Sequence, residues 1–285
     1  PRSVSSAASD VYKRQVLGRE NALWQVGVDG IHFQRRIDDN GDGFTDAPNM
    51  DRVVTTLRHQ HLSNERQSRL TARLFVEERF GGETGFREVD RGTDRAYGEC
   101  IDLLRSEMTW GSAPRRGRGW TFQGGGAFHR QNSTYGMTAF DAQEWIANVD
   151  AFHSGWSWSE NQYLRGGASL LWDVYKDETP ASSDMNVWVP SLFGEYAGEA
   201  GSWSWIHGVR VEKPSTQNWV VAPRINVKWT PHSIWDVRFN SGRGYRRVHL
   251  FTEEHAALDG SRDVLIAEGG LNPESSWNAN LVLTR

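Results

Sequence analysis

The chain has 285 residues, a formal net charge of −4 and 38% hydrophobic residues, enough for one large domain or two small ones. Its mean hydropathy is −0.63, and no apolar run approaches the ~20 residues that a membrane-spanning helix needs, so helical membrane proteins are excluded. The near-neutral charge argues against a nucleic-acid partner, and Cys100, the single cysteine, excludes a disulfide framework.

The first residues have an unusual character. Residues 5–15 read SSAASDVYKRQ, and one back-translation of this segment looks like a transposase adapter used in sequencing libraries. We therefore expect residues 1–15 to be a cloning or assembly scar. On this interpretation native sequence begins near Val16, and residues 16–285 form one domain.

From Ala22 onward, apolar and polar residues alternate with a period of two, which is typical of β-strands. Polar, Gly-rich connections separate these segments, and no segment has a convincing helical period. We expect about twelve strands, in chain order near residues 22–37, 50–62, 69–77, 99–110, 120–128, 145–151, 164–174, 188–196, 203–212, 219–229, 235–240 and 277–284.

The segment 219–229 has the features expected of a membrane-spanning strand. One face is wholly apolar and begins and ends with Trp219 and Trp229, whereas the other carries Arg224, Asn226 and Lys228. Ten steps span roughly 33 Å, or about 25 Å when tilted by about 40°, the height of the apolar band of a membrane barrel. Because Trp prefers the membrane interface, we expect aromatic girdles. Their predicted members are Trp203, Trp219, Trp229, Trp235 and Trp277.

The connections alternate in length. Short turns are expected near residues 64, 114, 158, 201 and 231, and longer loops at 38–49, 81–98, 132–142, 179–186, 213–218 and 244–276. Outer-membrane barrels have short turns on one rim and long extracellular loops on the other. The pattern predicts an all-β, antiparallel transmembrane β-barrel, in preference to a soluble β-sandwich.

The segment 38–46 is a candidate calcium loop. It fits D-x-N-x-D-G-x-x-D, with oxygen ligands from Asp38, Asn40, Asp42 and Asp46 and a carbonyl from Phe44. A Glu that closes such a site would stand at position 12, where the chain has Asn49. The alternative is a tight turn rich in Asp, Asn and Gly, because these residues favour turns unaided.

No catalytic constellation is evident, and we expect a protein that is not an enzyme and requires no cofactor, calcium being the one candidate. His59 and His61 share one strand face. They could form a metal pair, but we favour polar lining of the barrel lumen.

Three stretches resemble TonB-dependent outer-membrane receptors. The segments SGRGYRRVHLFTEEHAAL (241–258), SRDVLIAE (261–268) and LNPESSWN (271–278) are similar to a strand ending in G-R/K-G-[FY]-R, a loop with N/L-F-x-E, and a descending strand opened by L-x-P-E-x-[SA]-W-N. The acidic segment 38–48, together with residues 189–196, 208–210 and 222–224, resembles a Bacteroidota-like branch of the family.

This resemblance implies a 22-stranded barrel around an N-terminal plug, in the bacterial outer membrane. About twelve strands and no plug are recognisable, so we expect a slice of the barrel. The resemblance implies active uptake of a metal chelate, such as a ferric siderophore, haem or cobalamin, powered by the TonB complex through the plug, with outer-membrane lipid around the barrel. Ligand contacts would come from the long loops, with candidates Phe86, Arg87, Arg91, Arg95, Tyr97 and Tyr135.

Other functions remain open from the sequence. A receptor of the same fold could take up oligosaccharides, and a barrel without a plug would be a passive porin. A soluble or surface β-protein that binds calcium or glycan is a third class. The sequence does not choose among the possible cargoes.

Overall fold

The computed structural model describes residues 8–34, 37–178, 184–246 and 273–285. The expected loop residues 179–183 and most of the motif segment, residues 247–272, lie outside the described residues. No helix in the described part of the chain is long and apolar enough to cross a membrane.

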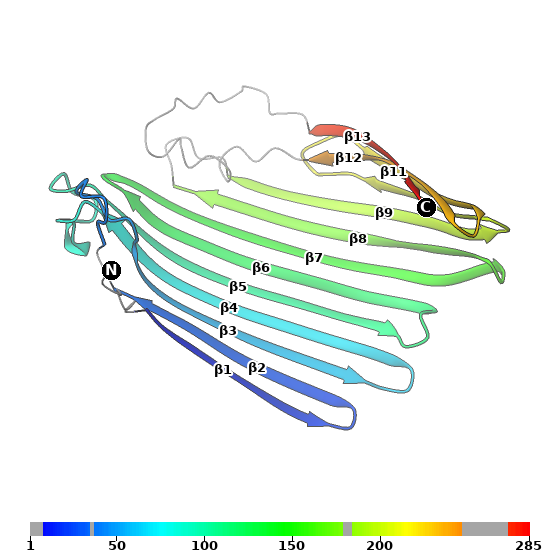
Figure 1. Cartoon of the computed structure of the whole chain (residues 1–285), viewed down its shortest axis with the longest axis horizontal. Coiled ribbons are helices and arrows are strands. Elements are labelled where there is room, and N and C mark those ends of the chain that lie inside the picture. Colours follow the sequence, from blue (N-terminus) through cyan, green and yellow to red (C-terminus); the bar gives the residue numbers. More distant parts are fainter. Residues whose placement is uncertain (1–7, 35–36, 179–183, 247–272) are drawn as a thin grey trace.

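The described residues form one sheet of 13 antiparallel strands, each paired with its neighbours in chain order (Figure 1). The structure thus adds one strand, β1, to the twelve expected. The strands are β1 (Ala8–Arg19), β2 (Ala22–Phe33), β3 (Asn49–Leu62), β4 (Arg66–Gly82), β5 (Gly98–Pro114), β6 (Gly119–Tyr135), β7 (Thr138–Ser159), β8 (Gln162–Asp177), β9 (Met185–Ala200), β10 (Trp203–Glu212), β11 (Val220–His232), β12 (Trp235–Arg246) and β13 (Glu274–Thr284).

Strand β1 runs through the segment that the sequence assigns to a scar. It pairs with β2 from Ala8 to Arg19 without a register shift. The pairing shows that these residues are compatible with the sheet, whereas their origin as a scar stays a prediction.

The two ends of the sheet differ in their connections, as the alternation of lengths predicts (Figure 1). The short-turn rim carries the connections β1–β2, β3–β4, β5–β6, β7–β8, β9–β10 and β11–β12, and the long-loop rim carries the others. One expectation is wrong: residues 132–142 are not a long loop. Strands β6 and β7 run through this segment and are joined by Gly136 and Met137 alone, because Gly136 adopts φ 58° and closes the hairpin tightly.

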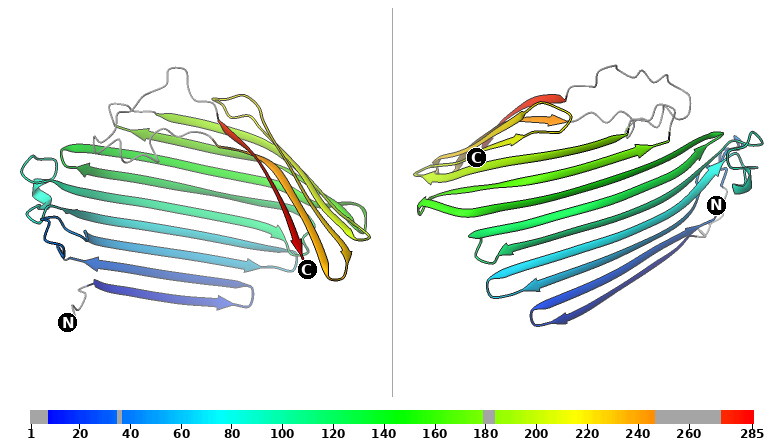
Figure 2. Two further views of the ribbon diagram at one scale, coloured as in Figure 1. Left: turned by 45° about the horizontal axis from the view of Figure 1, so that its top comes forward. Right: turned by 180° about the vertical axis from the view of Figure 1, so that it is seen from behind.

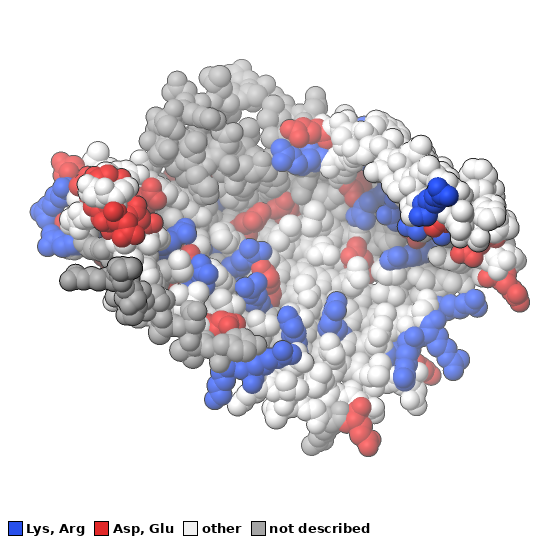
Figure 3. Space-filling view, in the orientation of Figure 1, with Lys and Arg blue, Asp and Glu red and all other residues white. Residues whose placement is uncertain are grey.

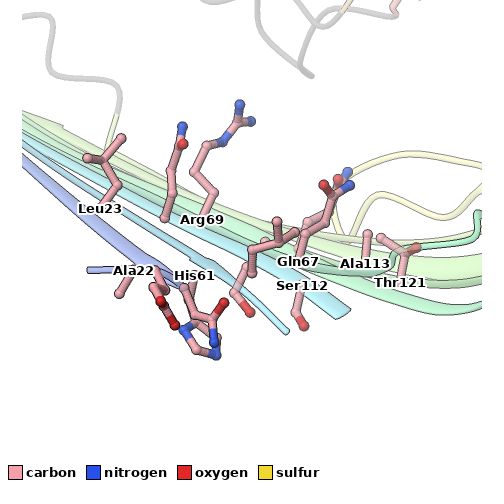
Figure 4. A pocket seen from close by; sticks show the side chains of 15 residues that line it. Ala22, Leu23, His61, Gln67, Arg69, Ser112, Ala113 and Thr121 are labelled. Atoms are coloured by element: carbon pink, nitrogen blue, oxygen red, sulfur yellow. The ribbon is translucent and has the colours of Figure 1, made fainter. Parts of the chain in front are cut away.

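Each strand sends alternate side chains to two contrasting faces. Ion pairs such as Arg52–Glu77, Arg224–Glu195 and Lys228–Asp236 lie on the face toward which the sheet curls, and Figure 3 shows charges of both signs over this concave face. Apolar side chains occupy the convex face. Figure 4 shows the alternation near the short turns, where Leu23 and Arg69 point to one side and His61 to the other.

The sheet has little packed core of its own. The described residues bury one small apolar cluster, Phe140, Ala142 and Tyr175, with Tyr135 and Met185 packed against it. Many large apolar residues stay exposed on the convex face, among them Val149 at 51% and Leu192 at 67%. An apolar surface of this extent needs lipid or protein to cover it, and the curled sheet in Figure 2 leaves that surface on its outside.

Candidate functional site

Trp residues on the convex face form two lines. Near the short-turn rim stand Trp24, Trp110, Trp120, Trp156, Trp203, Trp229 and Trp235. Nearer the long-loop rim stand Trp145, Trp172, Trp188, Trp219 and Trp277. Neighbouring members stack across strands, with ring centroids 5.3 Å apart in Trp203–Trp229 and 5.2 Å apart in Trp172–Trp188. Four of the five Trp residues predicted for girdles lie inside strands, and Trp219 lies one residue before β11.

The short-turn line crosses the strands obliquely. The residues that pair successively across the strands, starting from Trp24 on β2, end at Pro190 on β9. Trp203 on β10, however, pairs with Ala200 of β9, which lies ten residues further along that strand. A slip of about 33 Å over eight strand spacings of about 4.8 Å corresponds to a tilt of roughly 40°. Strands of outer-membrane barrels tilt by about 35–45°.

The two lines are separated by a membrane-like height. On β7, Trp145 and Trp156 are eleven residues apart with one bulge between Ser154 and Trp156, and Trp219 is ten residues from Trp229. Both spacings give roughly 33 Å along the strand, or about 25 Å across the band at that tilt. The convex face is thus an apolar band with a Trp border on each side.

The histidine pair lies on this convex face. His59 pairs in register with Trp24, and their rings stack with centroids 4.0 Å apart. His61, two residues on, shares that side. The expectation that these residues line the lumen is therefore wrong, because the strand parity places them among the outward-facing residues.

Two loops at the long-loop rim form one compact unit. Residues 37–48 are tied to the end of β4 by a backbone hydrogen bond from Thr45 N–H to the Gly82 carbonyl, and to connection 83–97 by one from Thr84 N–H to the Gly43 carbonyl, each 2.8 Å. Phe44 lies against Tyr97, with ring centroids 6.4 Å apart. A three-residue 3-10 helix, η1 (Glu88–Asp90), is the only helix in the described part of the chain.

The acidic loop is closed by its own backbone. Both Asp38 carboxylate oxygens accept backbone N–H bonds, Oδ1 from Gly41 at 2.7 Å and Oδ2 from Gly43 at 3.0 Å. Asn40 Oδ1 and Asp42 Oδ1 likewise accept backbone N–H bonds. Among the described residues no group of three or more His, Cys, Asp or Glu side chains is arranged to hold a metal. Calcium binding by Asp38, Asn40, Asp42, Phe44 and Asp46 stays a prediction, which these hydrogen bonds leave open because a carboxylate oxygen can accept an N–H bond and ligate a cation at the same time.

Of the predicted ligand-binding residues, Phe86 is a structural anchor. It is 3% exposed, and its ring lies so close to Gly98 that a Cβ there would come within 2.3 Å of Phe86 Cδ1. The ligand contact predicted for Phe86 is not available in this conformation, because the loop covers the ring.

The predicted arginines are held by carboxylates. Asp90 is buried, and its Oδ2 accepts a bond from Arg87 Nε at 3.0 Å, while Arg95 Nη1 lies 3.7 Å from Oδ1. The hydrogen bond from Arg87 holds the pKa of the Asp90 carboxyl below its usual value. Arg91 is anchored by Asp102 at 2.8 Å. Arg87 and Arg95 remain 63% and 72% exposed, so both present charge at the rim.

The two predicted tyrosines lie apart. Tyr97 is 40% exposed and its hydroxyl donates to Glu99 Oε1 at 3.1 Å. Tyr135 is the last residue of β6 rather than a loop residue, and its hydroxyl accepts from Gln131 Nε2 at 3.3 Å. Tyr135 packs against the apolar cluster on the concave face.

A polar row on the concave face escaped the sequence reasoning. The sheet register places Arg105 opposite His129, His129 opposite Glu144, and Glu144 opposite Tyr175. They line a hollow of about 350 Å³ that also includes Gln131 and Phe140. The row offers a cation, a carboxylate and aromatic rings, and it crosses β5, β6 and β7 six or seven residues from their long-loop ends, about 20 Å along the strand. Strand parity gives the face of each residue, but only the register shows that they are neighbours.

A second hollow, at the short-turn rim, is not a single chamber. It spans about 490 Å³, and its lining includes Leu23 and Arg69 from one face and Ala22 and His61 from the other (Figure 4). Because the sheet separates these side chains, this hollow is not a candidate for ligand binding.

Neither protein-family models nor curated protein sequences match the chain. Solved structures do. The ferric enterobactin receptor PfeA of Pseudomonas aeruginosa, in a mutant form, matches at 11% identity and a TM-score of 0.57, over 85% of this chain and 43% of that one. The siderophore receptor PirA of the same organism matches at 12% identity and 0.58, over 98% and 52%. The ferric citrate transporter FecA matches at 9% and 0.51, over 84% and 44%.

These likenesses establish the fold. The chain spans about half the length of these solved chains or less, and its 13 strands form part of a barrel of the kind found in TonB-dependent siderophore receptors. The fold that the sequence resemblance predicts is confirmed.

Proposed function

We propose that this chain is part of the wall of an outer-membrane receptor that takes up a metal chelate, with a ferric siderophore as the main candidate. The observation that carries the proposal is the pair of oblique Trp lines, roughly 25 Å apart, on a sheet whose other face is polar. The fold shared with receptors for ferric enterobactin and ferric citrate supports the class of cargo.

The lengths of the connections support an orientation of the wall in the membrane. The long-loop rim faces the cell exterior and the short turns face the periplasm, as in outer-membrane barrels generally. Arg87 and Arg95, both largely exposed at the outer rim, would attract an anionic ferric chelate through their long-range field. The row from Arg105 to Tyr175 lies deeper on the concave face and would contact the chelate inside the lumen.

The chain performs no covalent chemistry in this proposal. Its residues bind and guide the chelate, and the energy for transport comes from the TonB complex acting on a plug domain of the full-length protein. Outer-membrane lipid covers the convex face. The concave face, with paired charges such as Arg52–Glu77 and Lys228–Asp236, is suited to a polar plug or a hydrated lumen.

Uptake by the full-length gene product tests this proposal. It is expressed in a bacterial strain that lacks its own ferric siderophore receptors, and uptake of radiolabelled ferric enterobactin, ferric citrate and haem is measured with and without a functional TonB complex. We expect TonB-dependent uptake of at least one of them. Uptake without TonB would indicate a porin, and a lack of TonB-dependent uptake of all three compounds would contradict the proposed class of cargo.

A further inference from the structure

The concave face carries one arginine in each of six successive register rows over β3, β4 and β5. The register sets the residues of a row opposite one another, and neighbouring rows lie two residues, about 7 Å, apart along the strands. We call these residues the arginine stripe. From the long-loop rim toward the short turns they are Arg79, Arg52, Arg105, Arg73, Arg58 and Arg69. The stripe covers roughly 34 Å of strand, a length similar to that between the two Trp lines.

The whole stripe faces the concave side. Arg52 forms its ion pair with Glu77 on that face, and Figure 4 shows the Arg69 side chain on the same side of the sheet as Leu23. Residues two apart in a strand share a face, and so do residues that stand opposite one another in the register. The other four arginines therefore face the same way.

Carboxylates of these strands neutralise only the part of the stripe nearer the long-loop rim. Glu77 accepts a hydrogen bond from Arg52 Nε at 2.5 Å, and its Oε1 lies 3.9 Å from Arg79 Nε. Glu107 Oε1 lies 2.5 Å from Arg105 Nε. Glu77 and Glu107 are the two inward-facing carboxylates that β3, β4 and β5 contribute to the six rows. Six guanidinium groups on these strands thus face two carboxylates.

The three arginines nearest the short turns form an unpaired group around Thr71. Arg58 is opposite Thr71, and Arg69 and Arg73 lie two residues to either side of it on β4. All three arginines are exposed, and within the described part of the chain the ion pairs of the stripe belong to the other three members.

The surroundings of this group are mostly uncharged. On the flanking strands β2 and β6 the six rows contain one carboxylate, Asp29, which lies two rows nearer the long-loop rim than Arg58. In the rows of Arg58 and Arg69 the inward-facing neighbours on β2, β5 and β6 are Gln25, Leu23, Thr109, Gly111, Gly125 and Gln123. The positive charge at the short-turn end of the stripe is therefore not balanced by its neighbours.

Such an arrangement suits an anion that moves along the wall. A guanidinium group without a counter-charge stays in water or binds an anion, because removing an unpaired charge from water is costly. Cationic side chains line the path in anion pores, and several sites of moderate strength in succession let an ion both enter and leave. A contact with an acidic protein segment would need cations at one level, whereas the stripe has one in every row.

We propose that the arginine stripe is a path for anions along the lumen wall. A polyanionic ferric chelate that has passed the long-loop rim contacts successive guanidinium groups, and Arg58, Arg69 and Arg73 form its deepest station before the periplasm. The stripe thereby selects negatively charged chelates over neutral ones. This inference rests on the orientation and the class of cargo given under the proposed function.

Uptake of ferric enterobactin, a polyanionic chelate, by the full-length gene product tests the path. Arg58→Gln/Arg69→Gln/Arg73→Gln should lower the rate of TonB-dependent uptake about tenfold, because the deepest cations are lost. Binding of the chelate to cells without a functional TonB complex should stay the same. Arg58→Lys/Arg69→Lys/Arg73→Lys keeps the charges and should restore most of the uptake. Unchanged uptake in the Gln variant, or a parallel loss of surface binding, would overturn the path.

The matched control removes the same number of charges outside the lumen. Arg115→Gln/Arg116→Gln/Arg118→Gln changes three exposed arginines in the turn between β5 and β6. This variant should take up the chelate as the wild type does. A fall in uptake as large as in the Gln variant of the stripe would show that net charge alone matters, and it would overturn the path.

A second measurement depends on neither uptake nor the identity of the cargo. Thr71→Cys, in a Cys100→Ser background, places a thiol among the three unpaired arginines. In the purified protein, anionic sulfonatoethyl methanethiosulfonate should modify this thiol about tenfold faster than the cationic trimethylammonioethyl reagent, after correction for their rates with a free thiol in solution. The Gln variant should lose this preference. Equal corrected rates, or no reaction with either reagent, would overturn the path.

The two measurements separate this inference from the proposed function. A wild-type protein without TonB-dependent uptake of any chelate would contradict the proposed function, and the reagent rates would still decide whether the stripe attracts anions. Normal chelate uptake together with equal reagent rates would contradict the stripe alone.

Discussion

Single residues at the long-loop rim act as anchors for the loops more than as free ligand contacts. Phe86 is buried against Gly98, and Arg87 and Arg95 converge on the buried carboxylate of Asp90. The sequence indicates aromatic and basic residues here, and the structure shows that some of them hold the loop in shape. Only the exposed parts of the Arg87 and Arg95 side chains remain available to contact a ligand.

Removing the Asp90 carboxylate should loosen this loop. In Asp90→Asn the ion pairs to Arg87 and Arg95 are lost, so amide exchange in residues 83–97 should become faster while the strands keep their protection. Because the folded-state pKa of Asp90 is lowered, its contribution is present above the unfolded pKa of about 3.9 and is lost as the pH falls below that value. Hydrogen exchange at pH 7 and pH 3 measures this, and identical loop exchange in wild type and variant would contradict it.

Gly98 should tolerate no side chain. A Cβ there would meet the Phe86 ring at 2.3–2.4 Å, so Gly98→Ala must displace the ring and expose the loop to protease. Gly85→Ala is the matched control, because nothing lies within 4 Å of a Cβ at Gly85. Limited proteolysis of the folded protein compares the two, and equal resistance would show that the ring is not held as described.

At the scale of elements, strand parity is what the sequence predicts best. The faces expected for residues 219–229 are confirmed, with Arg224 and Lys228 paired to Glu195 and Asp236 on the concave face. The sequence wrongly indicated a loop at residues 132–142. Their Ser, Thr, Asn and Gly lie near the long-loop rim, where neither face of the strands belongs to the apolar band. Alternation is weak there, and polar strand residues resemble a loop.

Buried ion pairs on the concave face should matter more than the exposed ones. The Glu77 side chain is 3% exposed, and its Oε2 accepts from Arg52 Nε at 2.5 Å. Glu77→Gln leaves Arg52 without its counter-charge, and loss of one partner of a buried pair costs about 3–5 kcal/mol. Because Arg52 is 32% exposed, we expect the lower end, about 3 kcal/mol, in urea unfolding. No change in the unfolding midpoint would show that water screens this pair.

Two neighbouring residues of β7 allow a direct test of which face of the sheet contacts lipid. Val149 faces outward and is 51% exposed, whereas Asn148, its neighbour, bonds Asp150 on the concave face. An arginine near the bilayer midplane costs about 2–4 kcal/mol on the lipid side. Val149→Arg should therefore lower the free energy of unfolding in lipid vesicles by that amount, and Asn148→Arg should change it little. The reverse order would exchange the two faces.

At the scale of the whole molecule, the sequence predicts a curved antiparallel wall but not its register. The cross-strand neighbours Arg105, His129, Glu144 and Tyr175 come from four strands, and their partnership depends on pairings that no single segment encodes. The apolar band could be predicted because a Trp-to-Trp spacing of ten residues is a property of one strand.

The central claim is that this wall crosses the outer membrane with its long-loop rim outside. Cysteine labelling of intact cells tests it, in the full-length gene product with Cys100→Ser as background. Val89 at the long-loop rim is 75% exposed and Ile234 at the short-turn rim is 52% exposed. A membrane-impermeant maleimide should label Val89→Cys in intact cells, and Ile234→Cys only after the outer membrane is permeabilised. Labelling of both positions in intact cells, or of Ile234→Cys alone, would contradict the account.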